Sequence, residues 1–392
     1  MTPTGRPWTA SPPERARALA TLVRDGADEA ERERRLSEPV AIALAEAGLY
    51  RIAAPASVGG EECTPRTQIE TIEAVAEADG ATGWNLMIGV ENLGFLGATL
   101  PLETAHELFA DPRLIVAGAL NPLGRATPCD GGYRVTGQWP FASGCHNAHY
   151  FWGQCVLYDG DAPAPGPGGG LQMREALVPA SEIEILDTWH VSGMRGSGSH
   201  DVAIRDIFVP DERITAAMST PARERGTLYR MPPLCRLAYN KVGVSTGIAR
   251  AALDHFASFA AETKRRGSSK PLCDKPAAQV AMAEAEIALR SARAWVFEAV
   301  EELWDAVERG AEITTEQRAV VHLACSNAAA AAVRAVAGVH VAAGSAANFE
   351  SHPLERCLRN VRVVPQHIMV SGQWLESAGG ALLGQPHELP IG

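Results

Sequence analysis

Residues 131–151 read GGYRVTGQWPFASGCHNAHYF, and this stretch decides the fold because the periodicity of the chain changes around it. Gly131-Gly132 is a turn signal, and the residues after it are typical of a β-strand that follows a hairpin turn. An alternating pattern with a period of two extends from about 114 to 214. Further strands are expected at 150–158, 175–179 and 200–209. The middle third of the chain is therefore predicted to form a β-domain.

Helical patterns lie on both sides of these strands. Before them, Ser11-Pro12-Pro13-Glu14 is typical of a helix N-terminus with proline in the first turn, and it leads into an amphipathic run. After them, residues 242–261 and 276–309 keep apolar residues at helical spacing. The capping box Thr314-Thr315-Glu316-Gln317 begins a third helix that reaches about Ala343. Such long helices, apolar on all sides, indicate a four-helix bundle whose outer faces are buried in an oligomer.

We therefore expect an α+β protein with three domains. A chain of 392 residues is long enough for this division, at roughly 100–200 residues per domain. The expected domains are an N-terminal α-helical domain over residues 1–113, a central β-barrel domain over 114–220 and a C-terminal four-helix bundle over 221–392.

The composition excludes several classes of function. Acidic residues outnumber basic ones by 46 to 35 and no basic block occurs, so nucleic acid is a poor partner. No stretch reaches 18 uncharged apolar residues, so we expect no membrane span. The N-terminus lacks the apolar region of a secretory signal, and the eight cysteines are scattered without a CxxC pair. We expect a cytoplasmic protein with reduced thiols, no zinc ribbon and no disulfide framework.

The common catalytic motifs do not occur. The chain has no GxxxxGK followed by Ser or Thr, no HExxH, and no GxGxxG between a strand and a helix. The glycines at 193–198 lie inside the β-region, where they are typical of a tight connection between strands. The segment CHNAH at 145–149 has metal-ligand residue types, but they crowd together and no second cluster completes a tetrahedron. We interpret it as a polar loop and expect no metal site.

Four segments together resemble the acyl-CoA dehydrogenase superfamily. They are residues 131–151, DTWHVSGMRGSGSHDVAIRDIFVPDERI at 187–214, KRRGSSKPLCDKPAAQ at 264–279 and ERCLRNVRVVPQH at 355–367. Their order and spacing are similar to the family over nearly the whole chain. The resemblance implies the acyl-CoA dehydrogenase fold, a flavin cofactor and a homotetramer.

The chain departs from the true dehydrogenases at their catalytic base. In that family a carboxylate commonly stands nine residues after the Arg of a closing Arg-Asp pair, but here the pair is Arg359-Asn360 and the later position is Ile368. The alternative location, residues 235–247, offers no carboxylate either. His367 stands one residue before Ile368. Together with the WPFASG run at 139–144, it resembles the two-component flavin-dependent monooxygenases of the same fold.

This second resemblance implies a reaction. A separate reductase supplies reduced flavin, FADH2 or FMNH2, and O2 then gives a flavin hydroperoxide that hydroxylates an aromatic or heteroaromatic small molecule. His367 would be the catalytic base that removes the substrate proton, because an imidazole titrates near neutral pH. Ser143 would be catalytic as the hydrogen-bonding group at the flavin, in a dry pocket. Trp139, Phe141, Ala142 and Ser143 would line the cofactor.

Each of these residues also has a structural interpretation. His367 lies near a helix end, where a histidine is commonly structural or solvated, and Ser143-Gly144 is favoured in turns. Trp139 and Phe141 stand at positions i and i+2 of a strand, which is equally consistent with two core residues on one face.

The resemblance also implies a site for the flavin phosphates. Lys264-Arg265-Arg266 lie where the dehydrogenase family places an arginine that reaches the pyrophosphate of the neighbouring subunit, so Arg265 and Arg266 are cofactor-binding candidates. Gly344 resembles the other half of that site, and a solvated basic turn is the alternative. The GGxG motif of the family is reduced here to AGSA at 343–346, so FMN stays open beside FAD.

Two other functions stay open beside the flavin-dependent monooxygenase. An acyl-CoA dehydrogenase with a non-standard base would hold oxidised flavin tightly, and an acyl-CoA would reduce that flavin. A non-catalytic relative that kept the fold would gain no stability from FMN or FAD.

Overall fold

The computed structural model describes residues 8–166, 170–265 and 267–385. Two units make up the chain. Unit 1 consists of Met1–Thr64, Asn85–Val191 and Arg195–Arg230, and unit 2 of Pro65–Trp84, Ser192–Met194 and Met231–Gly392. The helix α5 (Gly80–Thr99) contributes to both units, because the division falls after Trp84.

Unit 1 begins with short helices that precede its sheet. They are α1 (Pro12–Ala18), α2 (Ala20–Glu33), α3 (Glu38–Glu46), the later part of α5, and α6 (Leu102–Phe109). The first helix begins where the sequence predicts, because Ser11 and Glu14 form a capping box in which the Ser11 N–H donates to Glu14 Oε2 at 2.8 Å. The second ends at Arg34, whose left-handed φ of 53° turns the chain toward α3.

The sheet of unit 1 has eight strands among the described residues, and its path is β6-β7-β2-β1-β3-β5-β8, with β4 paired to β3. The strands are β1 (Val116–Cys129), β2 (Gly132–Trp139), β3 (Tyr150–Asp159), β4 (Ala162–Pro163), β5 (Met173–Pro179), β6 (Glu184–Leu186), β7 (Asp201–Pro210) and β8 (Ile214–Thr215). The predicted hairpin turn lies between β1 and β2, where Gly131 has a φ of 75° and Cys129 faces Gly132. β1 and β3 pair in parallel, and the other neighbours are antiparallel. The path of the described strands runs from β6 at one end to β8 at the other.

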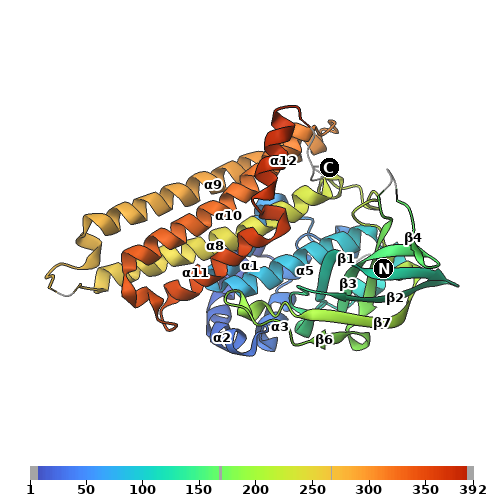
Figure 1. Ribbon diagram of the computed structural model, residues 1–392, viewed down its shortest axis with the longest axis horizontal. Coiled ribbons are helices and arrows are strands. Elements are labelled where there is room, and N and C mark those ends of the chain that lie inside the picture. The colour runs from blue at the N-terminus through green and yellow to red at the C-terminus, as the bar shows by residue number, and fades with distance from the viewer. Residues whose placement is uncertain (1–7, 167–169, 266, 386–392) are drawn as a thin grey trace. The chain divides into compact units, whose positions relative to one another are not determined.

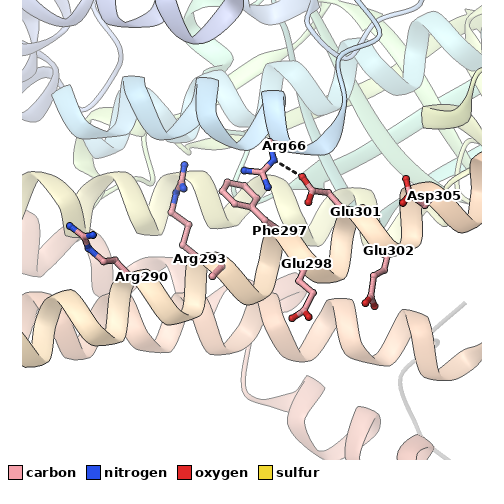
Figure 2. Close-up of a pocket in the computed structure, with 9 residues that line it drawn as sticks. Arg66, Arg290, Arg293, Phe297, Glu298, Glu301, Glu302 and Asp305 are labelled. Carbon is pink, nitrogen blue, oxygen red and sulfur yellow. Dashed lines mark hydrogen bonds and ion pairs between the residues drawn. The ribbon is translucent and has the colours of Figure 1, made fainter.

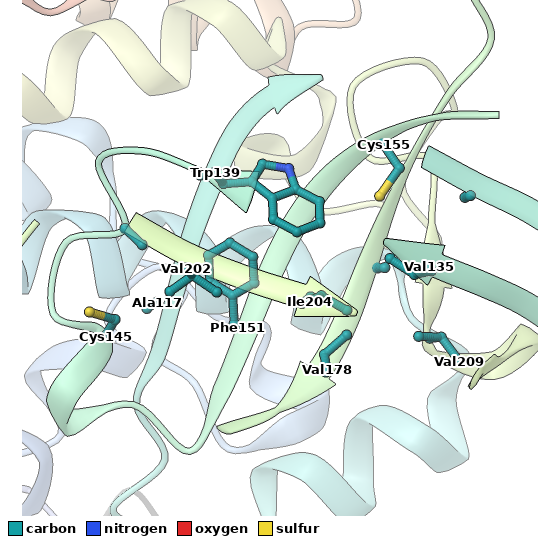
Figure 3. Packing of buried hydrophobic residues seen from close by; sticks show 14 of the residues in the cluster. Ala117, Val135, Trp139, Cys145, Phe151, Cys155, Val178, Val202, Ile204 and Val209 are labelled. Atoms are coloured by element: carbon teal, nitrogen blue, oxygen red, sulfur yellow. The ribbon is translucent and has the colours of Figure 1, made fainter. Parts of the chain in front are cut away.

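The indole of Trp139 lies in the apolar core of this sheet (Figure 3). Its Nε1 donates to the carbonyl of Gln154 at 2.7 Å, and its ring lies 5.5 Å from that of Phe151. Glycines on three neighbouring strands leave the space that the indole fills, since a Cβ would lie 3.1 Å or less from the ring at Gly124, Gly137 and Gly153. Of the two interpretations of Trp139, its complete burial and its hydrogen bond support the core position.

Unit 2 is built around a bundle of four helices that lie side by side (Figure 1). They are α8 (Pro233–Glu262), α9 (Pro276–Glu308), α10 (Thr315–Ala343) and α11 (Pro353–Val363). A further helix, α12 (Gln373–Leu382), packs on α10, and α4 (Pro65–Ala78) packs on α8. The predicted capping box of α10 is present, because the Gln317 N–H donates to Thr314 Oγ1 at 3.2 Å and the Thr314 N–H donates to Gln317 Oε1 at 3.0 Å.

The helix α10 is the central helix of the bundle and contacts α8, α9, α11 and α12. Its buried positions are mostly alanine, which lets the neighbouring helices approach closely. By length and composition alone α10 could cross a membrane, but 67% of its most apolar window is buried, as in the core helix of a bundle.

The secondary structure confirms the α+β class. Helices extend to Phe109, strands from Val116 to Thr215, and helices again from α7 (Thr227–Arg230) onward. The division into three domains at 113 and 220 stays a prediction.

Two helical glycines give a matched test of the packing in unit 2. A Cβ at Gly247 of α8 would lie 2.5 Å from the carbonyl oxygen of Glu73 in α4, whereas one at Gly338 of α10 would meet nothing within 4 Å. We expect Gly247→Ala to lower the free energy of unfolding by about 1–3 kcal/mol, because α4 and α8 must separate. Gly338→Ala should raise it by about 0.5–1 kcal/mol, since alanine is the better helix former. Urea denaturation measures both, and a Gly247→Ala variant as stable as the wild type would contradict this contact.

Candidate active site

The strand β2 ends at Trp139, and the turn after it holds three of the predicted residues. Phe141 has a left-handed backbone, with a φ of 64°, which costs a non-glycine residue about 1 kcal/mol or more. Phe141 is also 61% exposed, and its ring meets that of Trp189 edge-on with centroids 6.2 Å apart. An exposed aromatic ring on a strained backbone is typical of a ligand-binding position.

The next two residues of the turn, Ala142 and Ser143, are buried. Two backbone hydrogen bonds fasten the turn to the loop before β7. The Ala142 N–H donates to the carbonyl of His200, and the Gly144 N–H donates to the carbonyl of Ser197, each at 3.0 Å. The turn is therefore fixed by backbone contacts on both sides of Ser143.

Three serine hydroxyls lie in series beside this turn. Ser143 Oγ is 2.7 Å from Ser199 Oγ, which is 2.7 Å from Ser197 Oγ. All three residues are buried. Ser143 therefore belongs to a buried hydroxyl cluster and is not a solvated turn residue.

Two buried acceptors, Asn85 Oδ1 and Asn147 Oδ1, have no hydrogen-bond partner among the described residues. Asn85 borders the turn, because its Nδ2 donates to the carbonyl of Gly196 at 3.4 Å and a Cβ at Gly144 would lie 3.1 Å from its Oδ1. Asn147 ends the short helix η3 (Cys145–Asn147), which follows the turn directly. Buried acceptors without a donor are rare, and the ring N–H groups of a reduced flavin are donors of the kind that they lack. The residues of this turn therefore fit a reduced flavin.

His200 holds the segment that carries Trp189. His200 Nδ1 accepts from the Trp189 N–H at 3.3 Å, and Nε2 faces the carbonyl of Arg34 at 3.2 Å, so the ring carries its hydrogen on Nε2. Arg34 also pairs with Asp187, and this hydrogen bond holds the pKa of that carboxyl below its usual value.

The polar loop at 145–149 shows the effects of burial. Burial raises the pKa of the Cys145 thiol to about 12 and lowers the pKa of His146, whose ring lies 4.9 Å from that of His200. Within the part of the chain that the structure describes, no three His, Cys, Asp or Glu side chains gather into a metal-binding group.

In unit 2, His367 caps a short helical turn. Its Nδ1 accepts from the backbone N–H of Met369 at 3.2 Å, at the start of η11 (Ile368–Val370). Its ring is half-buried and meets that of Trp84 edge-on, with 5.6 Å between the centroids. Burial, followed by the charge of Lys241, lowers the pKa of His367 well below its usual value. His367 is therefore neutral at pH 7.

The hydrogen bond from Met369 also decides which nitrogen of His367 carries the hydrogen. Because Nδ1 accepts, the neutral ring carries its hydrogen on Nε2, which is a donor in that tautomer. To take a proton on Nε2, the ring must first move its hydrogen to Nδ1 and release the Met369 N–H. A role as base therefore requires a tautomer shift.

The Arg-Asn pair that replaces the Arg-Asp pair of the dehydrogenases has a structural role. Asn360 Oδ1 accepts from the Met194 N–H at 2.7 Å, and Arg359 donates to the carbonyl of Ser192 at 2.5 Å. These two side chains hold the segment Ser192–Met194 on α11, including the left-handed φ of 57° at Met194.

Arg265 and Gly344 meet at one end of the bundle. Arg265 donates to the carbonyl of Ala342 at 3.0 Å, near the C-terminus of α10, where a cationic donor is favourable. Gly344 follows with a φ of 82° and with open space where a Cβ would lie. Arg266 lies outside the described residues. The binding of a flavin by these residues stays a prediction.

An open groove of 690 Å³ lies between α4 and α9 in unit 2 (Figure 2). Arg66 pairs with Glu301, and Arg293 pairs with Glu73 at 2.8 Å. Both guanidinium groups lie over the ring of Phe297, at 4.0 Å and 4.3 Å from its centroid. Because these arginines already have carboxylate partners, the groove does not favour an anion. None of the residues predicted to be catalytic or to bind the cofactor lines it.

Another histidine, His322, lies inside the bundle. It stacks on Trp374 of α12 with 3.6 Å between the ring centroids and 2° between the planes. It is fully buried, and its Nδ1 has no hydrogen-bond partner in the described part of the chain, while Nε2 faces Cys235 Sγ at 4.0 Å. Burial lowers the pKa of His322 to about 4.

His322 predicts a pH dependence of stability. The unfolded chain binds a proton at this residue near pH 6.5 and the folded chain only near pH 4, so stability falls as the pH drops through that range. The pKa difference corresponds to about 3 kcal/mol at pH 4. We expect His322→Phe, which keeps a ring against Trp374, to lose much of this acid sensitivity. Unfolding free energies of both proteins at pH 7 and at about pH 4.5 measure it, and equal losses in the two would contradict the assignment.

The comparisons with known proteins cover nearly the whole chain. Residues 241–372 match the family described as acyl-CoA dehydrogenase, C-terminal domain. The indole-3-acetate monooxygenase of Pseudomonas putida is 32% identical, over 94% of this chain and 93% of that protein. The FADH2-dependent resorcinol hydroxylase, oxygenase component, of a Rhizobium species is 30% identical, over 95% of this chain and 92% of that protein. The crystal structure of the 3-HSA hydroxylase from Rhodococcus sp. RHA1 matches with a TM-score of 0.88 and 25% identity, over 98% of this chain and 99% of that one.

The chain therefore belongs to the acyl-CoA dehydrogenase superfamily, in the branch of the two-component flavin-dependent monooxygenases. Enzymes of this branch are oxygenases that use reduced flavin and O2. The predictions of the fold, of a flavin-dependent monooxygenase and of its reduced cofactor are confirmed.

Sequence reasoning misses part of the candidate site. Ser197 belongs to the glycine-rich stretch that the sequence indicates as a tight connection, and neither it nor Ser199 is expected near Ser143. The contact between Ser143 and Ser199 joins residues 56 positions apart, and small polar residues are common in loops. Asn85 follows Trp84 inside a helix, where a buried amide gives no periodic signal.

Proposed function

We propose that this protein is the oxygenase component of a two-component system that hydroxylates an aromatic or heteroaromatic small molecule with reduced flavin from a separate reductase. The turn after β2 carries the proposal. There an exposed Phe141 on a strained backbone stands next to the buried Ser143 and the partnerless acceptor of Asn85. The relatives support the substrate class, because their names give indole-3-acetate and resorcinol as substrates.

In this proposal the turn of unit 1 holds the flavin ring. Asn85 and Asn147 supply acceptors for ring N–H groups, Ser143 supplies a hydroxyl, and Phe141 supplies apolar surface. When bound, reduced flavin supplies the two electrons with which one atom of O2 enters the substrate and the other leaves as water. The buried side chains keep bulk water away, which favours oxygen transfer over release of hydrogen peroxide.

We also propose that His367 acts on the substrate group that loses its proton, such as a phenol hydroxyl or an indole N–H. In the tautomer set by Met369, Nε2 donates a hydrogen bond to the resulting anion. After its hydrogen shifts to Nδ1, the ring takes the proton itself. Both actions make the aromatic ring a better nucleophile toward oxygen.

His367→Gln distinguishes the two actions. Glutamine donates a hydrogen bond but takes no proton, so a base role predicts that this variant loses product as fully as His367→Ala, about 100-fold or more. A donor role predicts that His367→Gln stays within about tenfold of the wild type while His367→Ala does not. Single-turnover product formation with reduced flavin measures both. Unchanged turnover in His367→Ala would remove His367 from the reaction.

The reaction itself is tested with indole-3-acetate, resorcinol and a panel of phenols, together with a purified flavin reductase and NADH. We expect hydroxylated product only when the reductase supplies FADH2 or FMNH2, with one oxygen atom from isotopically labelled O2. Comparing FAD with FMN in the same assay decides between the two cofactors.

Two other results would contradict the proposed function. Tight binding of oxidised flavin, together with its reduction by an acyl-CoA, would identify a dehydrogenase with a non-standard base. A protein whose melting temperature responds to neither flavin would be a non-catalytic relative.

We further propose a cytoplasmic homotetramer. Val341 and Phe349, at the same end of α10 as Arg265, are 76% and 68% exposed, and such apolar surface suits coverage by a second copy. In that assembly Arg265 and Gly344 would reach the flavin of a neighbouring subunit. The free cysteines among the described residues suit a reducing compartment.

A further inference from the structure

The serine series of unit 1 consists of Ser197, Ser199 and Ser143, and its two oxygen–oxygen distances are both 2.7 Å. Ser197 is 0% exposed, and Ser199 and Ser143 are each 4% exposed, so water does not compete freely for these hydroxyls. The two backbone hydrogen bonds that fasten the turn, from Ala142 and from Gly144, keep the loops that carry these serines in place.

Counting hydrogens gives the series a direction. A serine hydroxyl donates one hydrogen bond and accepts up to two. Among the described residues, the hydroxyl of Ser197 has Ser199 Oγ as its hydrogen-bond partner, and a buried O–H that fails to donate is costly. Ser197 therefore donates to Ser199.

The donor and acceptor roles of the hydroxyls of Ser199 and Ser143 follow from this direction. Ser199 accepts from Ser197 and uses its own hydrogen toward Ser143, the other partner of its Oγ. Ser143 accepts this bond, so its own hydrogen goes to a partner other than Ser199. If the series ran the other way, Ser143 would give its hydrogen to Ser199 and would offer the cofactor lone pairs alone.

We propose that Ser199, oriented by Ser197, is a positioning residue that makes Ser143 a hydrogen-bond donor toward the reduced flavin. This inference rests on the proposed function, in which Ser143 contacts the flavin. Aligned hydroxyls polarise one another, so the terminal Ser143 is a stronger donor than an isolated serine.

Neutron diffraction on crystals of the deuterated wild-type protein tests the direction without any catalysis. We expect the deuterium on Ser199 Oγ to point at Ser143, and the deuterium on Ser143 Oγ to point away from Ser199. A deuterium on Ser143 that points at Ser199 overturns the proposal. This result does not depend on the substrate, so it is separate from the fate of the proposed function.

Variants test the consequence for the cofactor. Anaerobic titration with reduced FAD should show affinity about tenfold weaker for Ser199→Ala, as for the loss of one ordinary hydrogen bond, and Ser199→Thr should restore most of it. In the reductase-coupled reaction, Ser199→Ala should release a larger share of the consumed O2 as hydrogen peroxide. Ser245→Ala is the matched control, because it removes another fully buried hydroxyl, on α8, and should change neither quantity.

The double variant shows whether Ser199 acts through Ser143. If it does, Ser143→Ala with Ser199→Ala binds reduced FAD within about twofold of Ser143→Ala alone. Fully additive losses, or a Ser199→Ala variant equal to the wild type, would refute the positioning role. A wild type that binds reduced FAD but forms no hydroxylated product would instead count against the proposed function.

Discussion

The candidate site depends on the burial of one indole, that of Trp139. The ring fills space that glycines leave on three strands, and its N–H donates to the carbonyl of Gln154. Because these contacts fix the end of β2, they also fix where the chain leaves the sheet. Phe141 then lies outside the core and Ser143 inside it. A packing constraint in the sheet thus places the residues that we propose to bind the flavin.

Two histidines of unit 2 are kept neutral by desolvation. Burial lowers the pKa values of His322 and His367. A neutral imidazole donates through one nitrogen and accepts through the other, which an imidazolium does not do. For the proposed role of His367, the tautomer of the ring therefore matters more than its pKa. The backbone N–H of Met369 makes that choice.

Much of the fold could be predicted from the sequence because the deciding signals are local. The turn at Gly131 and the capping box at Thr314 each involve residues a few positions apart, and the segment that holds Ser143 resembles a known family. The contact of Ser143 with Ser199 joins residues 56 positions apart, beyond any periodic pattern. A strand predicts that Trp139 and Phe141 share one face, but the left-handed φ at Phe141 breaks the alternation, so the first is buried and the second exposed.

The backbone at Phe141 restricts which substitutions enzyme engineering can use there. Glycine and asparagine adopt a positive φ with the least strain, yet neither offers a flat apolar ring, and β-branched residues adopt it worst. Glycine at this position would relax the main chain but would also remove the ring. Substitutions that change the apolar surface around this ring are better directed at Trp189, which meets it from a backbone outside the left-handed region.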